Sequence, residues 1–189
     1  DKGVLTGENT DGQGFMIAQQ GAGVRPVVQN VVVFGAGGAS RAICVELALA
    51  GAKKLTIVNI PKDMALGESL VKTLKDNTAV TVDYVPWVGS FEVPADSHIV
   101  VNATSIGLHP NVNDKPDIDY DTLTTGMYVQ DVIPNPAFTP FLREADRRGI
   151  KWQSGMQMLI NQAALNITMW TGLQPDKEIM KRAFEEAMA

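Results

Sequence analysis

The chain has 189 residues, 45% of them hydrophobic, which is enough for one globular domain or two small ones with a core of their own. Its formal net charge is −5 and the sequence shows no basic face, which argues against a nucleic-acid partner. A single cysteine, Cys44, excludes a disulfide framework within one chain and favours a reducing compartment, so we expect a cytoplasmic protein.

The N-terminal part begins with residues 3–7, which suit a short strand or a connector. Thr10 is placed to cap a helix that runs to about Gln20, and Gly21 is its stop signal. Asp11 then falls in the first turn, where a carboxylate suits the helix dipole. That is the structural interpretation of Asp11, and a role in catalysis is the alternative.

A glycine-rich turn follows the next expected strand. The apolar run 31–34 is rich in β-branched residues, and small residues and a helical segment, 39–50, come after it. Strand, turn and helix in this order are typical of a dinucleotide-binding unit, in which backbone N–H groups at the helix start hold a pyrophosphate. The expected cofactor-binding residues of the turn are Gly35, Ala36, Gly37, Gly38, Ala39 and Ser40, with Ser40 in the third small position of the fingerprint. The alternative is a turn that is only structural.

Strands and helices alternate through the rest of the chain. We expect strands at 54–58, 80–85, 98–102, 127–132 and 150–153, helices at 61–75, 137–148, 155–171 and 176–188, and a polar loop at 104–125. This alternation predicts an α/β fold: a doubly wound parallel sheet, Rossmann-like and dinucleotide-binding, with C-terminal helices. The ligand crevice should lie beyond the carboxyl ends of the strands at 31–34 and 98–102, where the strand order switches.

The stretch from Ser154 to Pro175 carries no charged residue and is long enough to raise the question of a membrane span. Amide side chains at Gln157, Asn161, Gln162 and Asn166 argue against one, because they are costly to place in hydrocarbon. We therefore expect no membrane partner, and we place this helix in a cleft or a domain interface.

Three further groups of polar residues are candidates for a site. Asn102, Thr104 and Ser105 follow an expected strand and suit a loop near a ligand, although an Asx or Ser/Thr turn explains them equally well. Gln162 could bind a polyol through its amide, or it is a satisfied buried side chain. Neither histidine has a partner at metal-ligand spacing, so we expect no metal.

Taken in order, these segments resemble the shikimate/quinate dehydrogenase family. The matches extend over nearly the whole chain: Asn9–Gly12 with Gly14 and Phe15, Gly35–Ala42, Asn102–Ser105 with Gly107, Asp131–Val132, Asn135–Pro136, Thr139–Pro140, Gly155, Met158–Leu159, Gln162 and Trp170–Gly172. Each match is weak alone, but the ordered set is specific.

The resemblance implies an enzyme that reduces 3-dehydroshikimate to shikimate, or oxidises quinate, with a nicotinamide cofactor. It makes Asp11 the catalytic aspartate, which pairs with a lysine and contacts the substrate hydroxyl, and it makes Gln162 a substrate contact. The residues that it places along the cofactor are Asn102, Thr104, Ser105 and, through its backbone beside the nicotinamide, Gly155.

The family's substrate domain, which carries that lysine, lies upstream of the Asn-Thr-Asp motif, and only residues 1–8 here correspond to its end. We therefore expect residues 1–189 to form a single dinucleotide-binding domain, with residues 155–189 as helices that close back toward a missing N-terminal substrate domain. Such a fragment would bind cofactor and be inactive by itself. A second departure is Pro134, which stands where the family has a tyrosine.

The choice between NAD and NADP depends on the residues after the strand at 54–58. NADP-using members have arginines at the positions of Ile60 and Met64, and a 2′-phosphate needs such cations. Lys62 could act as a point charge, and Asn59 could accept a hydrogen bond from a ribose hydroxyl. The cofactor is therefore NAD or NADP, with NAD or dual use favoured.

Two other interpretations stay open. One is a non-catalytic nucleotide-binding or regulatory module, which would have no need of Asp11 together with Gln162. The other is a different dehydrogenase on the same scaffold, such as a methylene-tetrahydrofolate dehydrogenase or a glutamyl-tRNA reductase, although these lack the Asn-Thr-Asp segment.

Overall fold

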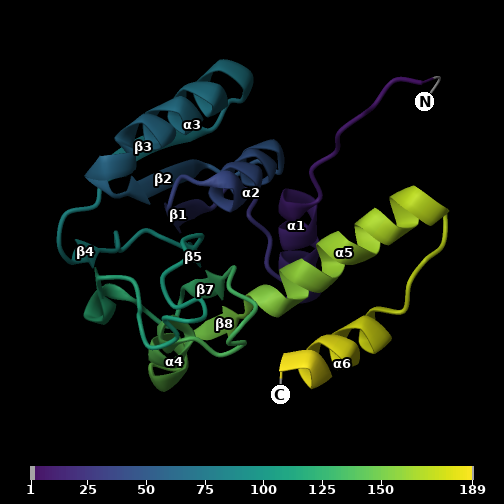
Figure 1. Cartoon of the computed structure of the whole chain (residues 1–189). Coiled ribbons are helices and arrows are strands. Elements are labelled where there is room, and N and C mark those ends of the chain that lie inside the picture. Colours follow the sequence, from purple (N-terminus) through teal and green to yellow (C-terminus); the bar gives the residue numbers. More distant parts are fainter. Residues whose placement is uncertain (1–2, 189) are drawn as a thin grey trace.

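A computed structural model of the chain describes residues 3–188 (Figure 1). Its centre is a six-stranded sheet of order β3-β2-β1-β5-β7-β8 in which all neighbouring strands are parallel. The strands are β1 (Asn30–Phe34), β2 (Lys54–Asn59), β3 (Thr81–Pro86), β5 (Ile99–Asn102), β7 (Tyr128–Asp131) and β8 (Lys151–Gln153). The fold class and the doubly wound parallel sheet are thus confirmed.

The strand order switches between β1 and β5, the two central strands. From this pair the chain builds outward through β2 and β3 on one side and through β7 and β8 on the other. Phe34, Asn102 and Asp131 share one row of the register, at the carboxyl ends of β1, β5 and β7. Loops that leave these ends therefore meet at one edge of the sheet, where ligands bind in open α/β sheets.

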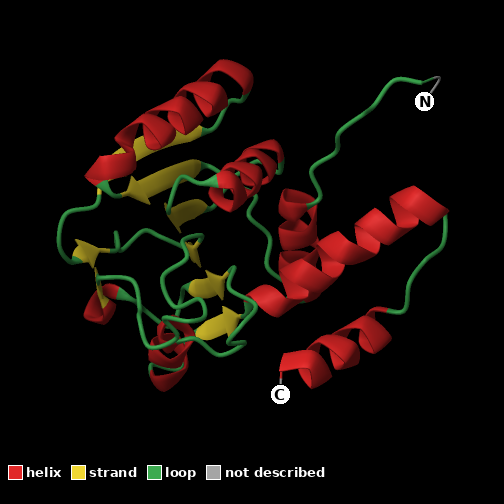
Figure 2. Ribbon diagram, viewed as in Figure 1, coloured by secondary structure: helices red, strands yellow, loops and turns green. Residues whose placement is uncertain are grey.

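Helices cover both faces of the sheet (Figure 2). One face packs against α1 (Asp11–Gly21), α2 (Gly38–Leu49), α3 (Met64–Asn77) and α5 (Gly155–Thr171). The other face packs against α4 (Pro140–Arg147) and the segment that contains η2 (Tyr120–Thr122) and the small parallel pair of β4 (Phe91–Glu92) and β6 (Ile118–Asp119). The last helix, α6 (Lys177–Met188), lies beside α5, and η1 (Pro61–Asp63) leads into α3.

Buried apolar side chains explain why the helices sit where they do. Phe15 of α1, Leu47 of α2 and Met158 of α5 belong to one core cluster with the strands of the sheet. On the opposite face, Phe141 of α4 and Trp87 after β3 belong to a second cluster. Removing apolar surface from water on both faces at once is the main driving force for this layered arrangement.

The element boundaries differ from expectation in a few places. Residues 3–7 form no strand, and β4 was not expected. The helix expected at 137–148 begins at Pro140, because the Thr139 hydroxyl accepts a hydrogen bond from the Leu142 N–H and caps it there. The loop expected at 104–125 contains β6 and η2. Of the segment assigned to an upstream domain, residues 1–2 lie outside the described residues.

In the described part of the chain, 3–188, no helix combines the length and the apolar character that crossing a bilayer requires. The uncharged helix α5 instead packs along α1. Gly14 makes this close approach possible, because a Cβ there would lie 2.8 Å from both the Met158 carbonyl oxygen and the Gln162 nitrogen.

Candidate functional site

The glycine turn after β1 is fixed by backbone contacts. Gly35 has φ +98°, and a Cβ there would lie 2.8 Å from the Ala103 carbonyl oxygen. A side chain at this position would therefore meet both backbone strain and the end of β5. The buried Ser40 hydroxyl donates to the Gly35 carbonyl at 2.7 Å, so Ser40 closes the turn as well as permitting close packing.

The next glycines leave room for a ligand at the start of α2. A Cβ on Gly37 or on Gly38 would meet nothing within 4 Å. Gly37 is the N-cap residue, no side chain caps the helix, and no acidic residue occupies its first turn. The first N–H groups of a helix lack partners within it and carry partial positive charge, so this end fits an anionic group such as a diphosphate. Ala36 is buried beneath the turn, and Ala39 is half-buried on the helix.

Asp11 is the first residue of α1 and is only partly buried. Its backbone N–H donates to the Asn9 side-chain oxygen at 3.0 Å. Thr10 is the N-cap residue, as expected, but its side chain makes no capping bond, and Asn9 bonds to the helix start instead. Thr10 instead donates toward α5, where Asn166 Oδ1 lies at 3.0 Å and Gln162 Oε1 at 3.4 Å.

Gln162 thus belongs to a polar cluster that joins the start of α1 to α5. Its Oε1 also accepts a hydrogen bond from Asn166 Nδ2 at 3.1 Å. The amide nitrogen of Gln162, Nε2, stays available as a donor. Thr10 and Asn166 were not among the expected site residues. The spacing of Gln162 and Asn166, one helical turn apart, is the signal that could have indicated Asn166.

The N-terminal motif and the glycine turn lie side by side. Asn9, Gly12, Gly38 and Arg41 line a common pocket with a volume of about 330 Å³. A Cβ on Gly12 would lie 2.5 Å from the Ala42 carbonyl oxygen, so α1 and α2 touch through backbone. The structure therefore places the two neighbours of the Asp11 segment, Asn9 and Gly12, beside the loop expected to hold the pyrophosphate, and Gln162 contacts the same segment through Thr10.

The loop after β5 is held by its own side chains. Asn102 is fully buried, and its Oδ1 accepts from the Thr104 N–H at 3.2 Å and the Thr104 hydroxyl at 2.6 Å. The Thr104 hydroxyl oxygen in turn accepts from the Ile106 N–H at 3.1 Å. The turn interpretation therefore describes Asn102 and Thr104, whereas Ser105 is exposed beside them.

The end of β2 offers an acceptor and no arginine. Asn59 is buried, and its Nδ2 donates to the Asp63 carbonyl oxygen at 2.9 Å. Since that carbonyl can only accept, the orientation of the amide is fixed and Oδ1 stays available. Ile60 and Met64 are partly exposed at 42% and 45%, and Lys62 is exposed.

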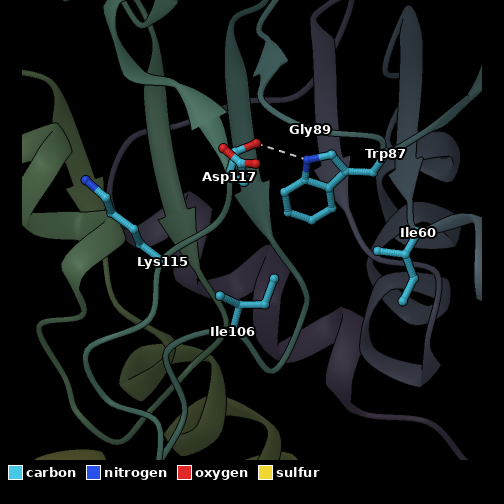
Figure 3. Close-up of a pocket in the computed structure, with 6 residues that line it drawn as sticks. All are labelled: Ile60, Trp87, Gly89, Ile106, Lys115 and Asp117. Atoms are coloured by element: carbon cyan, nitrogen blue, oxygen red, sulfur yellow. Dashed lines mark hydrogen bonds between the residues drawn. The ribbon is translucent and has the colours of Figure 1, made fainter.

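An apolar pocket of about 260 Å³ lies at the carboxyl ends of β2, β3 and β5 (Figure 3). Ile60, Trp87 and Ile106 supply its apolar side chains, and Lys115 and Asp117 complete the wall. The indole N–H of Trp87 donates to the Asp117 carbonyl oxygen at 3.0 Å, which fixes the ring. Trp87 and Ile106 come from distant loops, and no local pattern in the sequence indicated them.

Gly155 begins α5 directly against the segment that follows β7. A Cβ there would lie 2.1 Å from the Val132 carbonyl oxygen, and the Gly155 N–H donates to the Ile133 carbonyl at 3.2 Å. Glycine is thus required at this position by packing alone. Its backbone contact with a nicotinamide stays a prediction.

Cys44 of α2 is fully buried. Burial raises the pKa of its thiol to about 12, which keeps the sulfur protonated and unreactive at neutral pH. Cys44 therefore behaves as a small buried apolar residue.

Comparison with known families matches residues 155–183 to the Shikimate 5'-dehydrogenase C-terminal domain. Among curated proteins, the chain is 35% identical to the shikimate dehydrogenase (NADP(+)) of Desulforamulus reducens, over 100% of the chain and 65% of that protein. Many of the curated matches carry the same name.

Solved structures give the same picture. The ligand-free 5-ketofructose reductase of Gluconobacter sp. strain CHM43 is similar with a TM-score of 0.91 and 40% identity, over 99% of the chain and 66% of that protein. Shikimate 5-dehydrogenase from Listeria monocytogenes, in complex with shikimate and NAD, is similar with a TM-score of 0.88 and 30% identity, over 97% of the chain and 65% of that protein. The chain therefore spans slightly less than two thirds of the length of these relatives.

Proposed function

The chain belongs to the shikimate/quinate dehydrogenase family, and we propose that it is the dinucleotide-binding part of an NAD(P)-dependent oxidoreductase. Its substrates would be 3-dehydroshikimate and shikimate, or dehydroquinate and quinate. The observation that carries this proposal is the pocket shared by Asn9 and Gly12 of the N-terminal motif with Gly38 and Arg41 of the glycine turn. A group that donates or accepts a proton beside Asp11 would thus stand next to a bound dinucleotide.

The cofactor supplies the hydride, and the chain binds and orients it. The open N–H groups from Gly37 to Ala39 suit the diphosphate. The apolar pocket formed by Ile60, Trp87 and Ile106 suits the adenine ring, since most nucleotide sites are largely apolar with few fixed polar groups. The nicotinamide would then reach the start of α5, near Gly155.

We propose NAD rather than NADP as the better ligand. The free Oδ1 of Asn59 is an acceptor, which suits the hydroxyl of an NAD ribose and repels the oxygens of a 2′-phosphate. Ile60 and Met64 offer no cation where a phosphate would need one. The curated relatives are named for NADP(+), whereas the Listeria structure contains NAD, so both cofactors occur among similar proteins.

On the substrate side, Asp11 and Gln162 would act together with a lysine from a further domain. The relatives are longer than the chain, which covers 65% of their length, and this leaves room for such a domain in them. The end of α5 extends beyond the sheet (Figure 1). Trp170 near its end is exposed at 78%, and Leu173 just after it at 69%, which suits a surface that such a domain covers. Asp11 would orient the lysine, and the lysine would move the proton to or from the substrate oxygen.

Calorimetric titration of NAD and NADP into the chain at one ionic strength tests the cofactor site. We expect both to bind, NAD at least as tightly, and Gly37→Asp to abolish binding of both. Aspartate fits the backbone of Gly37, with φ −74°, and favours an N-cap, so this variant should fold while its charge repels a diphosphate.

Gly126→Asp is the matched control, because Gly126 is also exposed and open but lies in the loop before β7. If the control binds NAD normally and Gly37→Asp does too, the glycine turn is not the diphosphate site. If the unmodified chain takes up neither cofactor at millimolar concentration, the proposed function is wrong.

A second candidate substrate class is a keto sugar. The similarity to 5-ketofructose reductase favours it, because this relative has 40% identity and a TM-score of 0.91. Assays of a longer protein that includes the substrate domain, with shikimate, quinate and 5-ketofructose in parallel, would separate the two. A chain that binds NAD but turns over none of them in that longer form would support the non-catalytic module instead.

A further inference from the structure

Asp131 ends β7 with a carboxylate that is fully buried at the carboxyl edge of the sheet. Its Oδ1 accepts from Asn102 Nδ2 and from the Ile133 N–H, each at 3.1 Å. Its Oδ2 accepts from the Thr139 hydroxyl at 2.7 Å. Three donors from three different segments therefore converge on one side chain.

Each donor is itself a structural anchor of a loop. Asn102 holds Thr104 through its Oδ1 and so shapes the loop after β5. Ile133 begins the segment against which Gly155 packs. Thr139 caps α4 and ends the loop that starts after β7. Asp131 thus connects the loop that follows β5 to the loop that follows β7.

The carboxylate has no counter-ion in the described part of the chain: its three partners are neutral donors. Placing an unpaired charge in the interior is costly, and an apolar or amide side chain would fill the same space at lower cost. A charge makes hydrogen bonds that are shorter and stronger than neutral ones, which holds the two loops more rigidly.

We propose that Asp131 is a positioning residue of the cofactor site, which in its ionised form holds the loop 102–106 and the segment 132–139 in the arrangement that binds the dinucleotide. This rests on the proposed function. Burial raises the pKa of Asp131 to about 6, so the group titrates in an accessible range. Burial, the charge of Glu144 and the charge of Asp131 together raise the pKa of the Tyr120 phenol on η2.

Protonation of Asp131 would reverse the direction of its hydrogen bond with Thr139. A proton on Oδ2 that points at the Thr139 oxygen reverses this bond, and the Thr139 hydroxyl then no longer donates there. An asparagine at position 131 would do the same, since its Nδ2 would face Thr139 while its Oδ1 kept the other two donors. Asp131→Asn is therefore a permanent mimic of the protonated state.

The test is the dissociation constant of NAD at pH 5.5 and pH 8 for the unmodified chain and for Asp131→Asn. We expect the unmodified chain to bind about fivefold more weakly at pH 5.5, because one charge-assisted set of bonds is lost. Asp131→Asn should show that weaker affinity at both pH values. His109 also lies in this region, where its backbone N–H donates to the Asn135 carbonyl oxygen at 3.3 Å.

Gln130→Leu is the matched control. Gln130 precedes Asp131 on β7, is equally buried, faces the opposite side of the sheet, and its amide atoms have no hydrogen-bond partner among the described residues. It should leave the affinity and its pH profile unchanged. Should Asp131→Asn fail to fold, Thr139→Val should weaken NAD binding, and Thr139→Ser, which keeps the hydroxyl, should restore it.

The outcomes separate this inference from the proposed function. If the unmodified chain does not bind NAD at pH 8, the proposed function is wrong. If it binds and Asp131→Asn has the same affinity and pH profile, or Gln130→Leu weakens binding as much, Asp131 has only a structural role and the positioning inference is overturned.

Discussion

At the end of β2, we expect single side chains to determine whether the chain prefers the ribose of NAD or that of NADP. Asn59 presents an oxygen with its amide orientation fixed by the Asp63 carbonyl, and Ile60 beside it is 42% exposed. An acceptor and an apolar surface suit a hydroxyl and do not suit a phosphate. One residue is therefore expected to control the preference between the two cofactors.

Replacing Ile60 with arginine should create a phosphate contact. We expect Ile60→Arg to improve NADP affinity about tenfold, because a bidentate charged pair contributes on the order of 1.5–3 kcal/mol, and to leave NAD affinity nearly unchanged. Calorimetry with both cofactors at one ionic strength measures this. Leu66→Arg is the control, because it adds the same positive charge at another exposed position: Leu66 lies on α3 and is 47% exposed. Equal gains in both variants would mean that only net charge matters.

Asp131 also makes the stability of the chain depend on pH. Burial raises the pKa of its carboxyl from 3.8 to about 6, so between these values the folded chain keeps a proton that the unfolded chain has released. The protonated carboxyl of Asp131 contributes fully to the free energy of unfolding below pH 4. As the pH rises to 6 this contribution is lost, which lowers the free energy of unfolding by about 3 kcal/mol.

Denaturant unfolding at pH 4, 5, 6 and 7 measures this contribution as a difference between the unmodified chain and Asp131→Asn. The difference cancels the titration of the other carboxylates, including Glu144, whose pKa is lowered by Lys115 and Arg148 although burial opposes them. We expect the free energy of unfolding of Asp131→Asn to rise relative to that of the unmodified chain as the pH increases from 4 to 7. A constant difference across the range would contradict a raised pKa for Asp131.

At the scale of elements, the contact between α1 and α5 carries the candidate substrate side of the site. Thr10 and Gln162 meet only because Gly14 lets the two helix backbones approach. The uncharged character of α5, which raised the question of a membrane, is explained by burial of this helix against α1 and the sheet. Its amides serve contacts between helices.

Two glycines of α1 give a matched pair for testing that contact. We expect Gly14→Ala to destabilise the chain by about 1–3 kcal/mol, because its Cβ would lie 2.8 Å from backbone atoms of α5. Gly21→Ala, at the open end of the same helix, should be neutral or stabilising by up to about 1 kcal/mol. Thermal unfolding of both variants decides this, and equal effects would show that the helices are not closely packed.

At the scale of the whole molecule, we propose that the described residues form the cofactor side of a site and that a further domain supplies its other half. Asp11 is the first residue of α1, and Gln162 lies on α5, the helix that packs along α1. Apolar side chains at the end of α5 are exposed beyond them. We therefore expect the chain to bind a cofactor without turning over a substrate.

We expect the chain of 189 residues to bind NAD without reducing it in the presence of shikimate or quinate, whereas a longer protein with the substrate domain does so. In that longer protein, Asp11→Asn should lower turnover by about a hundredfold, because the proton-transfer group loses its partner, and should leave NAD affinity within about twofold. Spectrophotometric assays and NAD titration measure the two. Glu8→Gln, an exposed carboxylate nearby, should change neither. Normal turnover of Asp11→Asn would contradict the role given to Asp11.

Much of the fold follows from local patterns. The buried run at β1, the glycine turn and the helix after it have lengths and periodicities that short-range physics imposes, so their positions match expectation closely. The ends of elements are less predictable. Thr139 and Asn9 fix the starts of α4 and α1 through side-chain bonds, and several residues in each region could have served as caps.

The sequence by itself determined the alternation of strands and helices and the glycine-rich turn after β1, because each depends on neighbours within a few residues. The parallel sheet followed from that alternation, because helical crossovers return each strand in the same direction. Only the tertiary structure decided that Thr10 contacts Asn166, that Ile60, Trp87 and Ile106 surround one pocket, and that Asp131 ties two loops together. These contacts join residues far apart in the chain. They form because the strand order places the carboxyl ends of the strands side by side and because packing brings the backbones of α1 and α5 close together. No short stretch of the sequence determines either property.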